Sequence, residues 1–173
     1  MNIKGYDVNH LAAFARETVP DRWENLFEKA GLPTKAQPNG WYPLKAFAQV
    51  LMNIEEETKS EFGAMAWEYG HYSAKRDARG AQRLLFVFAS PNFIMKRANT
   101  FWSFYHDFGR VVLIPQTDNS VIMCLQECAG IPKIYLYNVG GWTEQALMLA
   151  GSKNPLVKID LSDPNEPRFD ITW

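Results

Sequence analysis

Apolar and polar residues alternate at the end of the chain. Phe169, Ile171 and Trp173 are apolar, and the residues between them are polar. A period of two is typical of a strand with one buried face. The run 155–161 upstream is also strand-like, and the proline-containing segment 162–167 between the two runs is typical of a turn. We therefore predict a terminal hairpin with one face that other elements must cover.

A second pair of strand-like runs lies earlier in the chain, at 110–115 and 120–126, on either side of the turn-forming residues 117–119. Both runs are apolar on both faces. This pattern predicts that the hairpin is central in its sheet or covered on both sides.

The segment 133–150 joins the two hairpins and carries two conflicting signals. Its residues 134–137 have strand propensity, but the rest is helical and is followed by Gly151, a common helix stop. We favour one long helix, in which Gly140 and Gly141 allow a close approach to the sheet.

The first part of the chain has helical periodicity, with apolar residues three and four positions apart. Proline or glycine ends most of these runs, and Pro43 lies at a first helical position. The acidic run Glu55, Glu56 and Glu57 is interpreted as a solvated helix face. The predicted helices cover residues 7–18, 21–30, 43–59, 61–78, 82–90 and 94–108.

These elements predict an α+β fold, with a helical N-terminal layer packed on a mostly antiparallel four-stranded sheet. The 173 residues and 19.8 kDa are suited to a single domain spanning 1–173. Within it we expect an N-terminal helical pair at 1–34 and a core at 40–173.

Charge and cysteine content exclude several classes of protein. A formal net charge of -1 gives no electrostatic attraction to nucleic acid or to an anionic membrane. The two cysteines, Cys124 and Cys128, form neither a disulfide framework nor a four-ligand zinc site. No apolar run is long enough to span a membrane, and the start of the chain has no signal-peptide pattern. We expect a cytoplasmic protein that binds no nucleic acid.

The order of elements, together with four local stretches, resembles the 4-vinyl-reductase-type domain and the related heme-NO-binding-like sensor domains. The nearest branch is the uncharacterised family described from myxobacterial genomes. The resemblance covers residues 40–173 and implies a sensory or ligand-binding domain, with the ligand held between the helices and one face of the sheet. Relatives bind heme, small aromatics, hydrocarbons or acyl chains, and some serve only as assembly surfaces. The stretches that carry it are Tyr42-Pro43, Phe101-Trp102 before Gly109, the span 140–151 and the closing segment 169–173.

The resemblance makes heme the sharpest cofactor hypothesis, because heme-NO-binding domains use a helical histidine and a Tyr-x-Ser-x-Arg motif. Here the segment 71–76 reads His-Tyr-Ser-Ala-Lys-Arg, in which the spacing is Tyr-Ser-x-x-Arg. The motif is not reproduced. We interpret His71 and His106 as helix-surface histidines with local hydrogen bonds rather than axial ligands, and His10 has still less support. No cofactor is predicted, and a heme-binding gas sensor stays an alternative.

No catalytic constellation accompanies these elements. Cys124 lies in an apolar strand, and Cys128 follows it without a neighbouring histidine or lysine to activate it. The acidic residues form no pair placed for acid–base chemistry. We therefore predict a non-catalytic domain.

Aromatic residues make up 14% of the chain, more than one face of each helix can bury. An apolar pocket with a few polar groups explains this excess, and ordinary core with a partner-binding surface explains it equally well. The chain is therefore expected to bind an apolar or aromatic small molecule, or to act as a homodimeric interaction module; a sensor would signal through a partner protein. The residues predicted to bind the ligand are Trp67, Tyr72, Arg76, Phe101, Trp102, Tyr105, Val112 and Met123.

Overall fold

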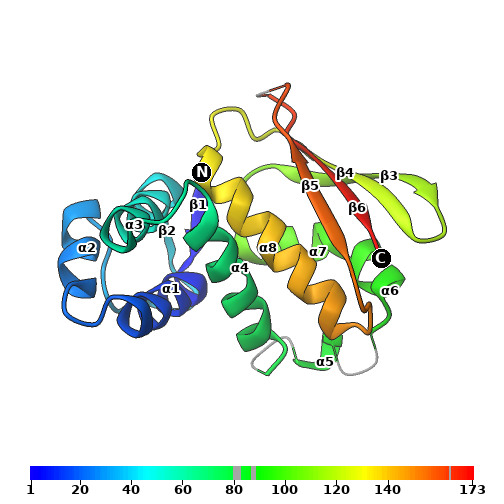
Figure 1. Cartoon of the computed structure of the whole chain (residues 1–173). Coiled ribbons are helices and arrows are strands. Elements are labelled where there is room, and N and C mark those ends of the chain that lie inside the picture. Colours follow the sequence, from blue (N-terminus) through cyan, green and yellow to red (C-terminus); the bar gives the residue numbers. More distant parts are fainter. Residues whose placement is uncertain (80–82, 87–88, 164) are drawn as a thin grey trace.

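The computed structural model describes residues 1–79, 83–86, 89–163 and 165–173. The chain begins with a small two-stranded sheet that the sequence pattern did not predict. Its strands come before and after the first two helices in the sequence and pair antiparallel (Figure 1). Tyr42 and Pro43, expected to open a helix, instead form the second strand, and the helix begins at Leu44. These elements are β1 (Asn2–Lys4), α1 (Gly5–Thr18), α2 (Trp23–Ala30), β2 (Trp41–Pro43) and α3 (Leu44–Thr58).

The middle of the chain is helical, with more breaks than predicted. The expected helix 94–108 is divided at Arg97 into two short helices, and the first of these is capped by the Ser90 side chain, which accepts a hydrogen bond from the Phe93 amide at 3.2 Å. Eight helices are present among the described residues, against about six predicted. Gly80, Gln82 and 87–88, which belonged to the prediction, lie outside the described residues. The helices here are α4 (Ala64–Asp77), α5 (Arg83–Phe86), α6 (Pro91–Lys96), α7 (Ala98–Tyr105) and α8 (Lys133–Leu149).

The main sheet has four strands in the order β3-β4-β6-β5, and all its pairings are antiparallel, as predicted. Phe169 and Ile171 are fully buried, which confirms the alternating pattern. β3 is an edge strand and Ile114 on it is 44% exposed, so the expectation of a hairpin covered on both sides is wrong for this strand. The strands are β3 (Arg110–Thr117), β4 (Ser120–Gln126), β5 (Leu156–Asp160) and β6 (Arg168–Thr172).

The helices α4 and α8 lie side by side between the N-terminal elements and the sheet (Figure 1). Glycines bring their backbones together. A Cβ atom at Gly70 would lie under 3.0 Å from backbone atoms of α8, and one at Gly141 would lie equally close to the backbone of Trp67. The long helix is confirmed, but Gly140 and Gly141 approach α4 rather than the sheet. None of the helices in the described residues has the length and apolarity required to span a membrane.

Glu55 corrects the interpretation of the acidic run. Its side chain is buried, and its carboxylate accepts backbone N–H groups from Gly63 at 3.0 Å, Met65 at 3.2 Å and Ala66 at 3.3 Å. These amides open α4 and have no partner inside the helix. Glu56 and Glu57 are not buried, so only those two form the solvated face.

Candidate ligand cavity

A cavity of about 70 Å³ lies where α4, α7, α8 and the first hairpin of the sheet meet. Aromatic side chains form much of its wall, and carboxyl, amide and hydroxyl groups interrupt them. The lining residues are Asp7, Ser73, Asp77, Ala98, Phe101, Trp102, Tyr105, His106, Val111, Met123, Tyr135, Asn138, Val139, Trp142 and Thr143.

Four of the predicted ligand-binding residues line this cavity: Phe101, Trp102, Tyr105 and Met123. They come from α7 and β4. Val112 does not line it; its neighbour Val111 does, because successive side chains of a strand point to opposite faces.

The other three predicted residues lie on α4 and do not line the cavity. The Trp67 ring packs on Gly140, and its Nε1 donates to Glu144 at 3.0 Å. The Tyr72 hydroxyl donates to Glu17 at 2.8 Å, and Arg76 donates to the same hydroxyl at 2.9 Å. The acidic group that this helix contributes to the cavity is instead Asp77.

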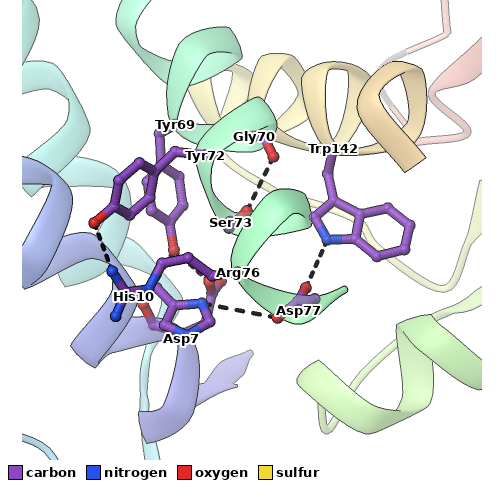
Figure 2. A network of polar contacts seen from close by, with 9 residues as sticks. All are labelled: Asp7, His10, Tyr69, Gly70, Tyr72, Ser73, Arg76, Asp77 and Trp142. Carbon is purple, nitrogen blue, oxygen red and sulfur yellow. Dashed lines mark hydrogen bonds and ion pairs between the residues drawn. The ribbon is translucent and has the colours of Figure 1, made fainter. Parts of the chain in front are cut away.

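Asp77 is the last residue of α4 and is 1% exposed. The Trp142 Nε1 donates to its Oδ2 at 2.8 Å, whereas its Oδ1 has no hydrogen-bond partner among the described residues. Figure 2 places this carboxylate between Trp142 of α8 and His10 of α1. His10 Nδ1 is 3.8 Å from Oδ1, outside hydrogen-bonding distance, and is itself unpartnered among the described residues. Burial raises the pKa of Asp77 to about 6, and the neutral donor groups of Tyr105 and Trp142 beside the carboxyl group lower it only in part.

Asp7 brings a second buried carboxyl group to the same wall. It lies on α1 and accepts a hydrogen bond from the Tyr69 hydroxyl (Figure 2). Burial raises its pKa to about 7, with a smaller contribution from the charge of Asp77. Asn138 of α8 adds a further buried acceptor, because its Oδ1 has no partner among the described residues. The unpartnered side-chain oxygens of this wall are therefore acceptors.

Sequence reasoning missed these polar residues, although a signal for two of them was present. Asp7 precedes Val8 and Leu11 on a helix whose apolar residues are buried, and Asp77 follows Gly70 and Ser73 on one side of α4. A single acid within an apolar helix face indicates a buried carboxyl group. Nothing in the local pattern distinguished Asn138.

His71 and His106 are both hydrogen-bonded, but only His106 has the local partner that was predicted. His106 Nδ1 lies 2.8 Å from the Trp102 carbonyl oxygen, and its Nε2 lies 2.6 Å from the Tyr135 hydroxyl. Burial lowers the pKa of His106 to about 4, so the ring is neutral at pH 7. The residue is buried and not on a helix surface, which corrects its predicted location. His71 Nε2 pairs with Glu144 Oε2 at 2.8 Å.

Heme does not fit this arrangement. An apolar cavity of about 150 Å³ holds one benzene molecule, and a porphyrin is several times larger than benzene. The cavity here is about 70 Å³. The two nitrogens of His106 are both engaged, and at Gly70 and Gly141 the backbones of α4 and α8 are in direct contact.

The sequence matches no protein-family model and no curated protein. Solved structures match it over nearly its whole length. A mutant H-NOX protein from S. oneidensis is 12% identical with a TM-score of 0.79, covering 98% of this chain and 95% of that one. A mutant H-NOX protein from K. algicida is 14% identical with a TM-score of 0.75, over 98% and 95%.

A third structure, 14% identical with a TM-score of 0.71 and covering 98% of this chain and 99% of that one, concerns the modulation of heme redox potential by porphyrin distortion. At these identities the likeness shows the fold alone. The α+β, heme-NO-binding-like fold predicted from the sequence is therefore confirmed. The 4-vinyl-reductase and myxobacterial parts of the resemblance stay predictions.

Proposed function

We propose that this chain is a non-catalytic sensory domain that binds a small molecule in the cavity between α4, α7, α8 and the sheet, and that it does so without heme. The observation that carries the proposal is a pair of buried acceptors, Asp77 Oδ1 and Asn138 Oδ1, that lack partners among the described residues and lie beside a cavity. Leaving such a group unsatisfied costs about 1–3 kcal/mol. A ligand that supplies donors removes this cost.

The position of the cavity supports a regulatory role. α1, α4, α7 and α8 each contribute residues to its wall, so an occupant contacts the N-terminal elements and the sheet side at once. A ligand that favours one arrangement of these helices shifts the population toward it.

The two cysteines give no support to nucleophilic catalysis. Burial raises the pKa of the Cys128 thiol to about 11, and the pKa of Cys124 is raised in the same direction by the same cause. Neither thiol forms a thiolate near neutral pH, and neither lines the cavity.

Heme reconstitution tests the cofactor part of the proposal. The purified protein is incubated with hemin, desalted and measured by absorbance, with the S. oneidensis H-NOX protein as the positive control. We expect no sharp Soret band to remain after desalting. A stable one-to-one complex whose band shifts in His106→Ala would contradict the heme-free proposal.

Fragment binding tests the cavity itself. Ligand-observed NMR with cationic, neutral and anionic fragments smaller than benzene should detect at least one binder. Ala98→Leu adds volume to the cavity wall and should remove that binding, whereas Ala129→Leu, at an exposed position outside the wall, should not. Absence of any binder, or equal binding to both variants, would contradict a ligand-binding cavity.

A homodimeric interaction module is the second candidate function. β5 is an edge strand of the sheet, and large apolar side chains are exposed on it and at the end of α8: Met148, Leu149 and Leu156. Light scattering coupled to size-exclusion chromatography separates the candidates. A dimer disrupted by Leu156→Lys favours this second function, and a monomer at high concentration removes it.

A further inference from the structure

The carboxyl end of α4 is an unusual place for a buried acid. The carbonyl groups at the end of a helix carry partial negative charge and favour a cation nearby. Asp77, the last residue of α4, adds a carboxyl group there and is almost completely buried. Both the helix end and the side chain therefore favour a positive partner.

Among the described residues, no lysine or arginine forms an ion pair with Asp77, and Arg76 donates its hydrogen bond to the Tyr72 hydroxyl instead. His10 of α1 is the basic group facing it, and burial together with the positive charge of Arg76 lowers the pKa of His10 to about 4. The ring is therefore neutral at pH 7. Tyr105 of α7 and Trp142 of α8 contribute neutral donors. Asp7, also on α1, adds a second acid rather than a base.

The atoms at this end of the cavity that have no partner among the described residues can all accept. Asp77 Oδ1 and Asn138 Oδ1 accept only, and Nδ1 of a neutral His10 accepts when the proton is on the other ring nitrogen. An alkylammonium group carries three N–H donors and a positive charge, whereas a water molecule carries two donors and none. An anion would be repelled by the carboxylates here.

The rest of the wall suits a short alkyl group attached to that charge. Phe101, Trp102, Tyr105 and Trp142 are aromatic, and the face of an aromatic ring attracts a cation. A volume of about 70 Å³ is less than half of the roughly 150 Å³ that holds benzene, which limits the ligand to a few non-hydrogen atoms. Divalent metal ions such as calcium need six or more oxygen ligands, far more than this wall provides.

We propose that the cavity is a binding site for a small primary ammonium ion, with its N–H groups donated to Asp77 and Asn138 and its alkyl group against the aromatic wall. This inference rests on the proposed ligand-binding function. It extends that function by naming the chemical class of the ligand.

Isothermal titration calorimetry at pH 8 with ethylammonium chloride tests the inference, with ethanol as the neutral analogue and KCl as the inorganic cation. We expect ethylammonium to bind and ethanol and K⁺ not to. Asp77→Asn keeps an oxygen for the Trp142 donor but removes the charge, and should weaken ethylammonium binding at least tenfold. Asp170→Asn changes the net charge equally at an exposed position on β6 and should leave binding unchanged. Circular dichroism melts confirm that both variants are folded.

The outcomes separate this inference from the function on which it rests. If neutral or anionic fragments bind in the NMR screen and ethylammonium does not, the ammonium inference is overturned and the cavity function stands. If no fragment of any charge binds, both are overturned. Equal binding of K⁺ and ethylammonium would also overturn the inference, as would equal affinity in Asp77→Asn and the unchanged protein.

Discussion

The two ends of α4 each receive a buried carboxyl group, with opposite results. At the amino end, Glu55 accepts three backbone amides, and the positive end of the helix dipole stabilises its charge. At the carboxyl end, Asp77 has one oxygen without a partner among the described residues and lies at the negative end of the dipole. The first acid has the environment of a structural group. The second has the environment of a ligand-binding group, because one of its oxygens has no hydrogen-bond donor among the described residues.

The comparison shows why burial alone does not identify a functional acid. Both carboxyl groups are buried, at 6% exposure for Glu55 and 1% for Asp77. They differ in whether the surrounding donors are sufficient. Unsatisfied buried polar groups are uncommon in folded proteins, so each one requires an explanation. For Asp77 the explanation that we propose is a ligand in the adjacent cavity.

The largest effect should come from breaking the contact that holds α4 against α8. Gly141→Ala places a Cβ against the Trp67 backbone, which cannot move aside, and should cost more than the roughly 1–3 kcal/mol typical of overpacking. Urea unfolding measures it. Gly31→Ala is the control: its Cβ meets nothing, and its positive φ of 68° predicts a loss of about 1 kcal/mol. Equal losses would refute the close packing.

Asp7→Asn should change how the free energy of unfolding depends on pH. Burial raises the pKa of Asp7 from 3.8 to about 7, so the folded state holds the extra proton and loses stability as pH rises from about 4 to 7. The variant has no such loss from this position, and the loss from Asp77, whose pKa burial also raises, occurs in both proteins. Its advantage over the unchanged protein should be near zero at pH 4 and reach at most about 4 kcal/mol above pH 7.

The difference between the two proteins is the quantity to measure. His10 and His106, with pKa values lowered to about 4, gain stability as pH rises from 4 to about 6.5 and offset part of the slope. Both proteins contain these histidines, so their contribution cancels in the comparison. Urea unfolding of both proteins from pH 4 to 8 measures this difference in the free energy of unfolding. A difference that stays constant with pH would show that Asp7 is ionised in the fold.

Glu55→Gln should have a smaller effect. It removes the negative charge and one of the two accepting oxygens at the start of α4, and the expected loss is about 1–2 kcal/mol. Glu56→Gln, at the exposed neighbour, should change stability by less than about 0.5 kcal/mol. Thermal melts at pH 7 distinguish the two. If Glu55→Gln left the stability unchanged, Glu55 would belong to the solvated helix face that the sequence predicted.

Much of the fold could be predicted because most helices and strands have a clear periodicity of apolar residues in their own sequence. The alternation through Phe169 and Ile171 reported a half-buried strand, and the helix at 133–149 followed from its length and its glycine stop. Tyr42 and Pro43 were misread because their strand is defined by pairing with β1, a contact distant in sequence. The edge position of β3 likewise depends on strand order, which no local pattern records.

The cavity was predictable only in its apolar half. Phe101, Trp102 and Tyr105 are aromatic residues on one short helix, and their periodicity placed them together. The polar residues of the wall were not predicted. Tyr72 and Arg76 were expected to contact the ligand, but they form hydrogen bonds with each other and with Glu17 and do not line the cavity. Which polar group lacks a partner depends on the whole three-dimensional arrangement, and sequence periodicity contains no information about it.

Carbon-13 NMR can follow the titration of the Asp77 carboxyl group with and without saturating ethylammonium chloride, and so shows whether a cation binds beside it. We expect a pKa of about 6 in the free protein and a value well below 6 in the complex, because a cation beside the carboxylate stabilises its charge. A pKa of Asp77 near its ordinary value of 3.8 in the free protein, or one that ethylammonium leaves unchanged, would contradict this expectation.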